Sequence, residues 1–121
     1  MILVDTSVWI DHLRVGEAKL VALLGDETVL THPLVIGELA CGSIRNRAEV
    51  LDLIGRLPKP PIASDVEALE LIDRHKLTSK GIGYIDVHLL ASTLLMPGAR
   101  LWTKDNRLAS IASELKIEFV V

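Results

Sequence analysis

The chain of 121 residues alternates between short apolar runs and longer amphipathic segments from one end to the other. Apolar runs that suit short strands lie at residues 2–5, 28–31, 101–103 and 117–120, with a short extended piece at 62–63. This alternation is typical of an α/β fold, in which helices cover a mostly parallel central sheet as a three-layer sandwich. No repeat, low-complexity tract or change in composition divides it, so residues 1–121 are expected to form a single domain.

Helical periodicity and end signals predict seven helices between these runs. Five are expected at residues 7–13, 17–24, 47–57, 84–96 and 106–115. Another begins near Pro33, because proline suits a first helical turn, and ends near Gly42. The last begins at Ser64, which has capping-box spacing to Glu67.

The composition indicates a soluble cytoplasmic protein. Half of the residues are hydrophobic, so the chain can bury a substantial core. The single cysteine, Cys41, permits no internal disulfide and fits a reducing cytoplasm. The first residues reach Asp5 without a basic region, unlike a signal peptide. No stretch approaches the roughly 18 apolar residues of a membrane span.

The charge balance bears on which partners the protein can bind. A net charge of −3 argues against simple phosphate binding, which needs a basic surface. If four carboxylates surround cations, however, the remaining surface is close to neutral, and basic residues can still form a local path for phosphates. Only 3% of the residues are aromatic, so a single-strand binder built on base stacking is not expected.

Four acidic residues stand where a solvated carboxylate is not expected: Asp5, Glu38, Asp86 and Asp105. Asp5 and Asp105 each follow an apolar run, and ligands bind at the carboxyl ends of parallel strands. Glu38 and Asp86 have apolar or glycine neighbours three and four positions away, namely Leu34, Val35, Cys41 and Gly42 for Glu38, and Ile82, Gly83, Leu89 and Leu90 for Asp86. A carboxylate on an apolar face costs free energy unless a cation or hydrogen bonds compensate it. We therefore expect the four to share a metal site.

Each acid also has a purely structural interpretation. Asp5 and Asp105 can be helix N-caps, since aspartate is preferred there. Glu38 and Asp86 can be buried acids that accept hydrogen bonds from hydroxyls or the backbone. Convergence of all four would make a metal-free structural role expensive, because like charges repel.

The kinds of residue present narrow the chemistry of such a site. No cluster of His or Cys has zinc-ligand spacing. An oxygen-only ligand set selects a hard cation, Mg²⁺ or Mn²⁺. His88 is two positions from Asp86 and projects from another side of the helix, so we interpret it as a surface or packing residue. Ser7 and His88 are not expected to form a hydrolase triad, because the chain lacks a G-x-S-x-G elbow.

The acidic residues lie within sequence motifs of a known family. The chain carries V-D-T-S-V-W at positions 4–9 and W-T-K-D at positions 102–105, with Glu38 and the segment I-D-V-H-L-L-A at positions 85–91 in helices between them. In content and order these resemble the PIN-domain nucleases. Over the entire chain, the length and arrangement are similar to the VapC-type toxins of bacterial toxin–antitoxin pairs.

This resemblance implies a metal-dependent endoribonuclease that cuts structured RNA, such as tRNA or ribosomal RNA, and is silenced by a small antitoxin encoded nearby. Asp5 and Asp86 match the principal metal ligands, and Glu38 and Asp105 complete the acidic set, all four being catalytic. Thr6 and Thr103 match hydroxyl positions that order the carboxylates or bound water. Many relatives carry another acid three positions after the one at Asp105, where this chain has Leu108. A second metal would then be held weakly, or only with RNA present.

Other residues are candidates for contacts with RNA or protein. The basic residues Arg45, Arg47, Lys104 and Arg107 adjoin the acidic segments and can hold flanking phosphates, although solvated surface charge explains them too. The apolar residues Val8, Trp9, Ile10 and Leu13 and those at 20–24 exceed what one sheet face requires. They suggest a homodimer or antitoxin docking there, and core packing explains much of the same pattern.

Two other functions fit parts of the sequence. A receiver-type signalling domain has a similar length, an acidic Mg²⁺ pocket and a late lysine. Such a domain also needs a phosphoacceptor aspartate after a middle strand, whereas Asp52 falls on a solvated helical stripe. It usually has adjacent acids after its first strand, whereas here Thr6 follows Asp5. The second alternative is a catalytically silent PIN-like interaction module.

Overall fold

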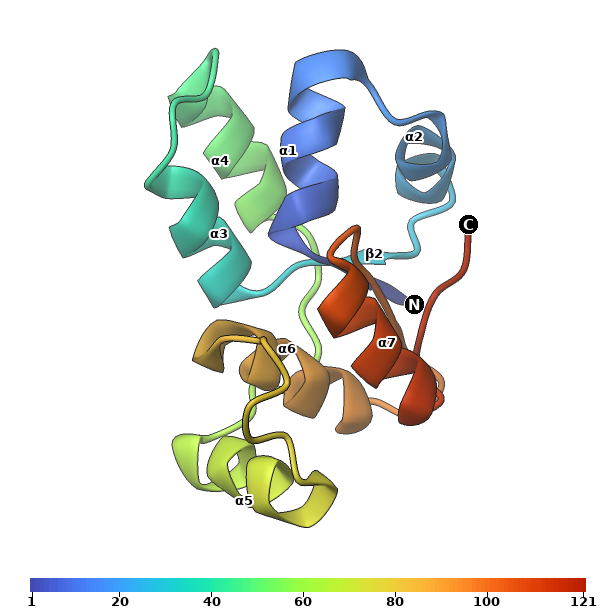
Figure 1. The fold of residues 1–121 in the computed structure, drawn as a ribbon. Coiled ribbons are helices and arrows are strands. Elements are labelled where there is room, and N and C mark those ends of the chain that lie inside the picture. Colours follow the sequence, from blue (N-terminus) through green and yellow to red (C-terminus); the bar gives the residue numbers. More distant parts are fainter.

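Three parallel strands form the centre of the structure, a computed structural model that describes residues 1–121 (Figure 1). The strands β1 (Ile2–Val4), β2 (Val29–Leu30) and β3 (Arg100–Trp102) pair in the order β2-β1-β3. Leu3 lies opposite Leu30 on one side and Leu101 on the other. The central strand β1 is thus buried along its whole length, as its unbroken apolar sequence requires in a parallel sheet.

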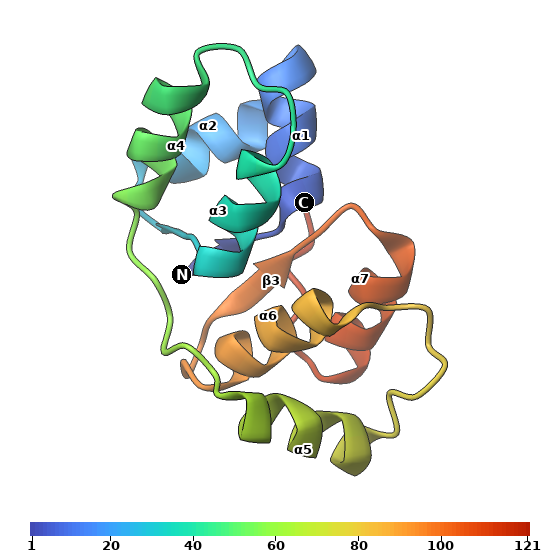
Figure 2. The same cartoon turned by 90° about the vertical axis from the view of Figure 1, so that its left-hand side faces the viewer.

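Helices lie on both sides of this sheet. In Figures 1 and 2, α1 (Thr6–Val15), α2 (Ala18–Gly25), α3 (Pro33–Ala40) and α4 (Arg47–Gly55) lie above it, and α5 (Asp65–His75), α6 (Tyr84–Leu94) and α7 (Asn106–Glu114) below it. Helix α5 packs on α6, away from the sheet. The predicted α/β architecture is confirmed. None of the helices combines the length and apolar character needed to cross a membrane.

All seven predicted helices are present close to their expected bounds, but two of the extended segments are not strands. Near the C-terminus the expected strand at 117–120 is reduced to one bridge between Leu101 and Glu118. Pairing stops there because the following residues, Val120 and Val121, lie exposed, without packing that would hold them. At 62–63 the Ala63 N–H donates to the Ser92 hydroxyl at 3.0 Å instead of to a neighbouring strand.

A buried histidine joins these layers. His32 precedes α3 and is 1% exposed. Its Nδ1 accepts a hydrogen bond from the Leu34 N–H at 3.1 Å, so the neutral ring carries its proton on Nε2, which lies 3.1 Å from the Ser92 hydroxyl of α6. Burial, helped by the charge of His88, lowers the pKa of His32 to about 4. Protonation of Nδ1 would break its hydrogen bond with the Leu34 N–H, so His32 caps α3 only while it is neutral.

We expect this histidine to make the protein less stable in mild acid. The unfolded chain binds a proton near pH 6.5 and the folded chain only near pH 4. The free energy of unfolding should therefore fall as the pH is lowered through that window, by up to roughly 3 kcal/mol from this group. Urea unfolding at several pH values should show a smaller pH dependence for His32→Asn, which can still cap α3. His75→Asn, at an exposed position, serves as the control. If the free energy of unfolding depends equally on pH in wild type and in His32→Asn, His32 is not the group responsible.

Candidate metal-binding site

Asp5 lies at the junction of β1 and α1 and is the most deeply placed of the four acids. Its side chain is 6% exposed, and its Oδ2 accepts hydrogen bonds from the hydroxyls of Ser7 and Thr103, both at 2.7 Å. Asp5 occupies the N-cap position of α1, yet its carboxylate makes no capping hydrogen bond. The N-cap interpretation is therefore wrong for Asp5. Its carboxylate instead connects the end of β1 to the end of β3.

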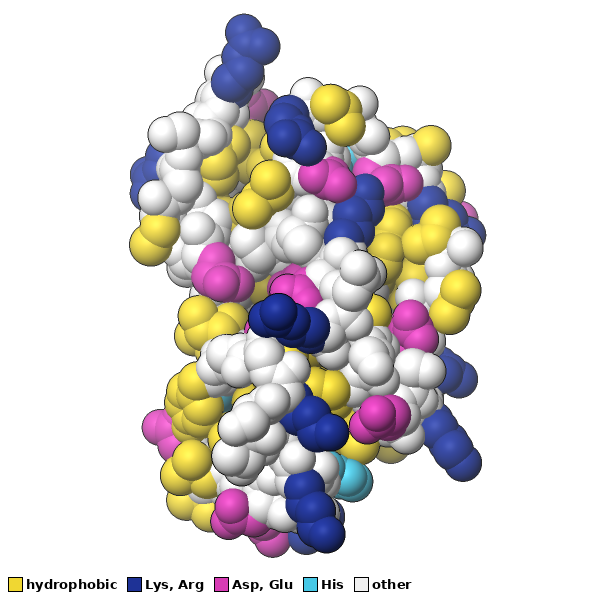
Figure 3. All heavy atoms as spheres, in the orientation of Figure 1, with side chains coloured by type: hydrophobic (Ala, Val, Ile, Leu, Met, Phe, Trp, Pro, Cys, Tyr) yellow, Lys and Arg dark blue, Asp and Glu magenta, His cyan; other side chains and the backbone are white.

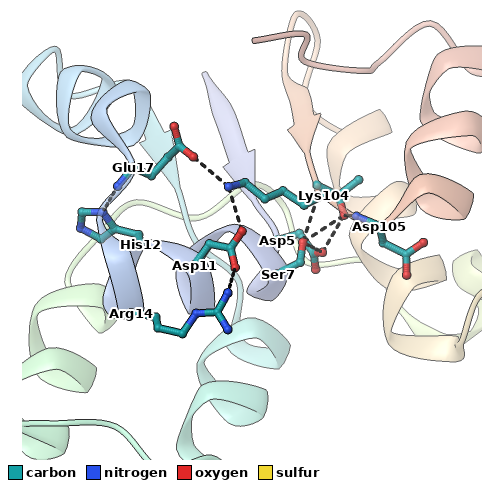
Figure 4. A network of polar contacts seen from close by, with 9 residues as sticks. Asp5, Ser7, Asp11, His12, Arg14, Glu17, Lys104 and Asp105 are labelled. Carbon is teal, nitrogen blue, oxygen red and sulfur yellow. Dashed lines mark hydrogen bonds and ion pairs between the residues drawn. The ribbon is translucent and has the colours of Figure 1, made fainter.

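The segment after β3 is fastened to α1 and α2. The Lys104 N–H donates to the Ser7 hydroxyl at 3.0 Å, and the Asp105 N–H donates to the Thr103 hydroxyl at 3.0 Å. The Lys104 amine extends away from Asp105 and lies between Glu17, at 2.8 Å, and Asp11, at 2.9 Å (Figure 4). Hydrogen bonds to Glu17 and then Asp11 raise the pKa of Lys104. The structure therefore uses Lys104 to hold the segment in place, which removes it from the candidates for phosphate binding.

Glu38 and Asp86 come from helices on opposite sides of the sheet. Glu38 Oε1 accepts a hydrogen bond from the Thr6 hydroxyl at 2.7 Å, and Asp86 Oδ2 accepts one from the Gly83 N–H at 3.1 Å. The expectation of an inward-facing carboxylate holds partly for Asp86, which is half-buried, and is wrong for Glu38, which is exposed. Of its helical neighbours, Val35 is buried in the core, and only Gly42 lines the open groove beside Glu38.

Asp105 does cap a helix. Its Oδ1 accepts hydrogen bonds from the N–H groups of Arg107, at 2.9 Å, and Leu108, at 3.2 Å, at the start of α7. The capping interpretation is thus correct for Asp105, but capping occupies only one of its oxygens. Each of the four acids uses only one oxygen within the protein, since Asp5 Oδ1, Glu38 Oε2, Asp86 Oδ1 and Asp105 Oδ2 accept no hydrogen bond from it.

The four acids interact electrostatically. Burial raises the pKa of Asp86, and the charges of Asp5, Asp105 and Glu38 raise it further, against the lowering effect of the Gly83 N–H. As the side chains lie in the structure, no three acidic, histidine or cysteine side chains form a group that could hold a metal ion. The chemistry of the set nevertheless fits a hard divalent cation. It offers four carboxylates with free oxygens, and a cation would offset their mutual repulsion.

Several other candidates have structural roles instead. His88 is buried, with its Nε2 3.0 Å from Asp65 Oδ1 on α5, which agrees with a packing role and leaves it unable to pair with Ser7. Arg47 donates to the Ala40 carbonyl at 2.8 Å, at the end of α3. Leu108 is fully buried in the core, so a carboxylate at this position would not be tolerated without rearrangement.

A groove of about 510 Å³ opens next to Glu38, between α1 and the end of α3. Ile10, Leu13, Leu39 and Ile44 line its apolar walls, and Arg14 and Arg45 also contribute to it. Arg14 is paired with Asp11 at 3.3 Å, whereas the Arg45 side chain has no partner within the protein. The groove therefore combines apolar surface with a free cation beside one of the acids.

Sequence reasoning missed the role of Ser7. The sequence suggests only a nucleophile at this position, but the Ser7 hydroxyl donates to Asp5 and accepts from the Lys104 N–H. The signal was its position two residues after Asp5, in the first turn of a helix. From there a short hydroxyl side chain reaches back to the residue before the helix.

We expect Asp86→Asn to stabilise the metal-free protein at neutral pH. The pKa of Asp86 is raised, so the folded chain holds this proton more tightly than the unfolded chain, and stability falls as the pH rises through that window. Asparagine removes the charge and can still accept from the Gly83 N–H. Thermal unfolding in EDTA should give a higher Tm for Asp86→Asn, by a few degrees, and little change for the exposed Asp52→Asn. A lower Tm for Asp86→Asn would show that repulsion among the acids is not significant.

Comparison with known proteins identifies the family. Residues 2–114 match the PIN domain. The chain is also 53% identical over 114 residues to proteins named ribonuclease VapC32 from two strains of Mycobacterium tuberculosis, CDC 1551 / Oshkosh and H37Rv, with 94% of this chain and 92% of each relative covered. The receiver-type alternative is wrong, in agreement with Asp52, which lies on α4 and pairs with Arg56 at 2.8 Å. The chain belongs to the PIN-domain family.

Proposed function

We propose that this chain is a metal-dependent endoribonuclease and the toxin of a toxin–antitoxin pair. The observation that carries the proposal is the mutual influence of four carboxylates from separate segments, each with one oxygen free. The relatives named ribonuclease VapC32 support RNA as the substrate. From the resemblance to VapC-type toxins, we propose that this RNA is structured, such as tRNA or ribosomal RNA.

The residues have distinct roles in this proposal. Asp5 and Asp86 would hold Mg²⁺ or Mn²⁺ with their free oxygens, and Glu38 and Asp105 would complete the set. Such a cation supplies positive charge to a phosphate and lowers the pKa of bound water. The hydroxyls of Thr103 and Ser7 fix Asp5, and that of Thr6 fixes Glu38. These hydrogen bonds reduce the freedom of the carboxylates before substrate binds.

The chain also determines which nucleophile attacks. Glu38 Oε2 and Asp105 Oδ2 are unbonded and exposed, so either can take a proton from an attacking water. Attack by the ribose 2′-hydroxyl commonly uses a pair of histidines as base and acid. His32 and His88 are buried, His12 Nδ1 accepts a hydrogen bond from the Glu17 N–H, and His75 ends α5, which packs on α6 away from the sheet. We therefore propose products with 5′-phosphate and 3′-hydroxyl ends.

The face that carries the site offers a path for a phosphate chain. Figure 3 shows Lys and Arg side chains distributed down this face, from the end formed by α3 and α4 at the top to α5 at the bottom. Acidic side chains lie beside basic ones near its centre. The net charge of −3 thus does not describe this face, and a local path for RNA is compatible with it.

We expect Asp5→Asn to abolish cleavage. Wild type and Asp5→Asn should be incubated with total RNA in Mg²⁺ or in EDTA. Only wild type with Mg²⁺ should produce fragments, because the substitution removes the charge of the best-fixed ligand. The cleavage rate should fall by at least about 100-fold, because the loss of a group that only hydrogen-bonds to a metal ligand already lowers activity by up to that factor. Identical RNA in all lanes would favour the catalytically silent module, and 2′,3′-cyclic phosphate ends would contradict the water route.

Thr103→Val provides a graded test in the same assay. It removes a hydroxyl that donates to Asp5 but leaves all four acids in place. Activity should fall by about 10- to 100-fold, and Mn²⁺ affinity measured by calorimetry should fall with it. Thr103→Ser should retain both. Thr93→Val is a matched control, since that buried hydroxyl donates to the Leu89 carbonyl within α6.

We propose the groove beside Glu38 as the docking site of the antitoxin. Val8, Trp9, Leu20 and Leu23 form part of the core, so they offer no docking surface. Ile10 and Leu13 are exposed and line the groove, where docking stays a prediction. A peptide with apolar and acidic side chains fits these walls and the free Arg45. Bound there, it would cover Glu38 and block the site.

We therefore expect Leu13→Glu to escape inhibition by the antitoxin while keeping ribonuclease activity. Val15→Glu is the control, because Val15 is 76% exposed on the same helix and does not line the groove. Cleavage assays with and without the co-purified partner measure the activity of each variant and its inhibition. Equal inhibition of the two variants would place the antitoxin elsewhere.

We also propose that the protein is a homodimer and acts in the cytoplasm. Exposed apolar residues of α5 and at the end of α6 support the dimer. Val66, Leu69, Leu94 and Leu95 are at least 40% exposed, and Figure 3 shows hydrophobic side chains gathered over these helices at the lower left. Light scattering measures the free state. A mass near 13.2 kDa would show a monomer and contradict the dimer.

A further inference from the structure

Arg107 lies in the first turn of α7, where a basic side chain does not help the helix. The positive end of the helix dipole is at this terminus, so a cation there is mildly destabilising. The cap is made by Asp105, which accepts from the Arg107 N–H without involving its side chain. Helix stability therefore gives no reason for arginine at this position.

The Arg107 side chain lies across Gly81, in the loop between α5 and α6. A Cβ on Gly81 would stand 2.6 Å from Arg107 Cδ, 2.9 Å from Nη1 and 3.0 Å from Nε, and the φ of Gly81 is +80°. Glycine thus provides both the backbone conformation and the space that the guanidinium occupies. Any larger residue would push the arginine aside.

This contact bridges two of the segments that carry the acids. The loop with Gly81 leads to Gly83, whose N–H donates to Asp86, and Arg107 follows Asp105 by two residues. Despite this position, the Arg107 guanidinium makes no hydrogen bond or ion pair within the protein. Lys104, by contrast, is paired with two carboxylates, and Arg47 with a carbonyl.

We propose that Arg107 binds an RNA phosphate next to the scissile one, and that Gly81 positions its guanidinium for this contact. An unpaired guanidinium offers five donors in a planar fork that matches a phosphate. The four carboxylates would direct the scissile phosphate to their cation. The phosphate within reach of Arg107, beyond Asp105 and over the loop before α6, is then a neighbouring one. This inference rests on the proposed ribonuclease function.

Cleavage of a defined RNA in Mg²⁺ by Arg107→Ala tests the contact. KM should rise by about 10-fold with kcat little changed, because a charged hydrogen bond to the substrate is lost. RNA binding in EDTA should depend less on salt, with the slope of log K against log salt reduced by about 0.7 to 0.9, the effect of one phosphate contact on a single strand or a duplex. Arg107→Lys should restore part of both.

Gly81→Ala tests the positioning role. The clashing atoms belong to the end of a flexible side chain, so the arginine should move instead of the loop. KM should rise as in Arg107→Ala, and the double variant should be no worse than Arg107→Ala alone. Gly98→Ala is the matched control. Gly98 has a φ of +81° and no atom within 4 Å of an added Cβ, so it carries the same backbone strain without the clash.

The outcomes separate this inference from the proposed function. If wild type does not cleave RNA, the ribonuclease proposal fails. If wild type cleaves and Arg107→Ala leaves KM and the salt slope unchanged, only the phosphate contact is wrong. An equal effect of Gly81→Ala and Gly98→Ala would overturn the positioning role. A lower Tm with an unchanged salt slope would show that Arg107 only fastens α7 to the loop.

Discussion

The geometry of the site depends on the Asp5 carboxylate, which joins the ends of two neighbouring strands. Two hydroxyls, from Ser7 and Thr103, donate to the same oxygen, and the Asp5 N–H donates to the Trp102 carbonyl. Because β1 is the central strand and fully buried, Asp5 has little freedom to move. The other acids are placed relative to this fixed point by α3, α6 and the segment after β3. A rigid sheet thus carries a polar group at a position where burial without these donors would be costly.

Much of the fold follows from the sequence, because its local signals agree with its packing. Proline at the start of α3 and the capping box of α5 fixed two helix starts, and the apolar runs of β1 and β3 marked buried strands. The exceptions have physical causes. Ile62 and Ala63 form no strand because Ser92 takes the Ala63 N–H, a contact with a distant helix that no local pattern reveals. The last residues lack packing and leave the sheet after one bridge.

The candidate site was predictable in composition but not in detail. The position of Asp5 and Asp105 after apolar runs gave two acids, and the lack of polar helical neighbours gave Glu38 and Asp86. The same neighbours suggested that Glu38 faces inward, whereas Val35 packs into the core and Glu38 itself lines a groove open to solvent. Helical periodicity identifies an apolar face but not whether another element covers it. The roles of Lys104 and Arg47 depend on tertiary contacts with Glu17 and Ala40, and sequence spacing does not contain them.

The basic residues near the four acids do not pair with them. A cation paired directly with these carboxylates would compete with a metal ion, and the nearby lysine is instead held by Asp11 and Glu17. Burial and then the charges of Asp5, Asp105 and Glu38 raise the pKa of Asp86, and no basic side chain contributes to lowering it. Arg107 is kept close but pairs with none of them, since it lies against Gly81. Positive charge is therefore available near the acids without pairing with them, which suits the proposed binding of both a cation and a phosphate.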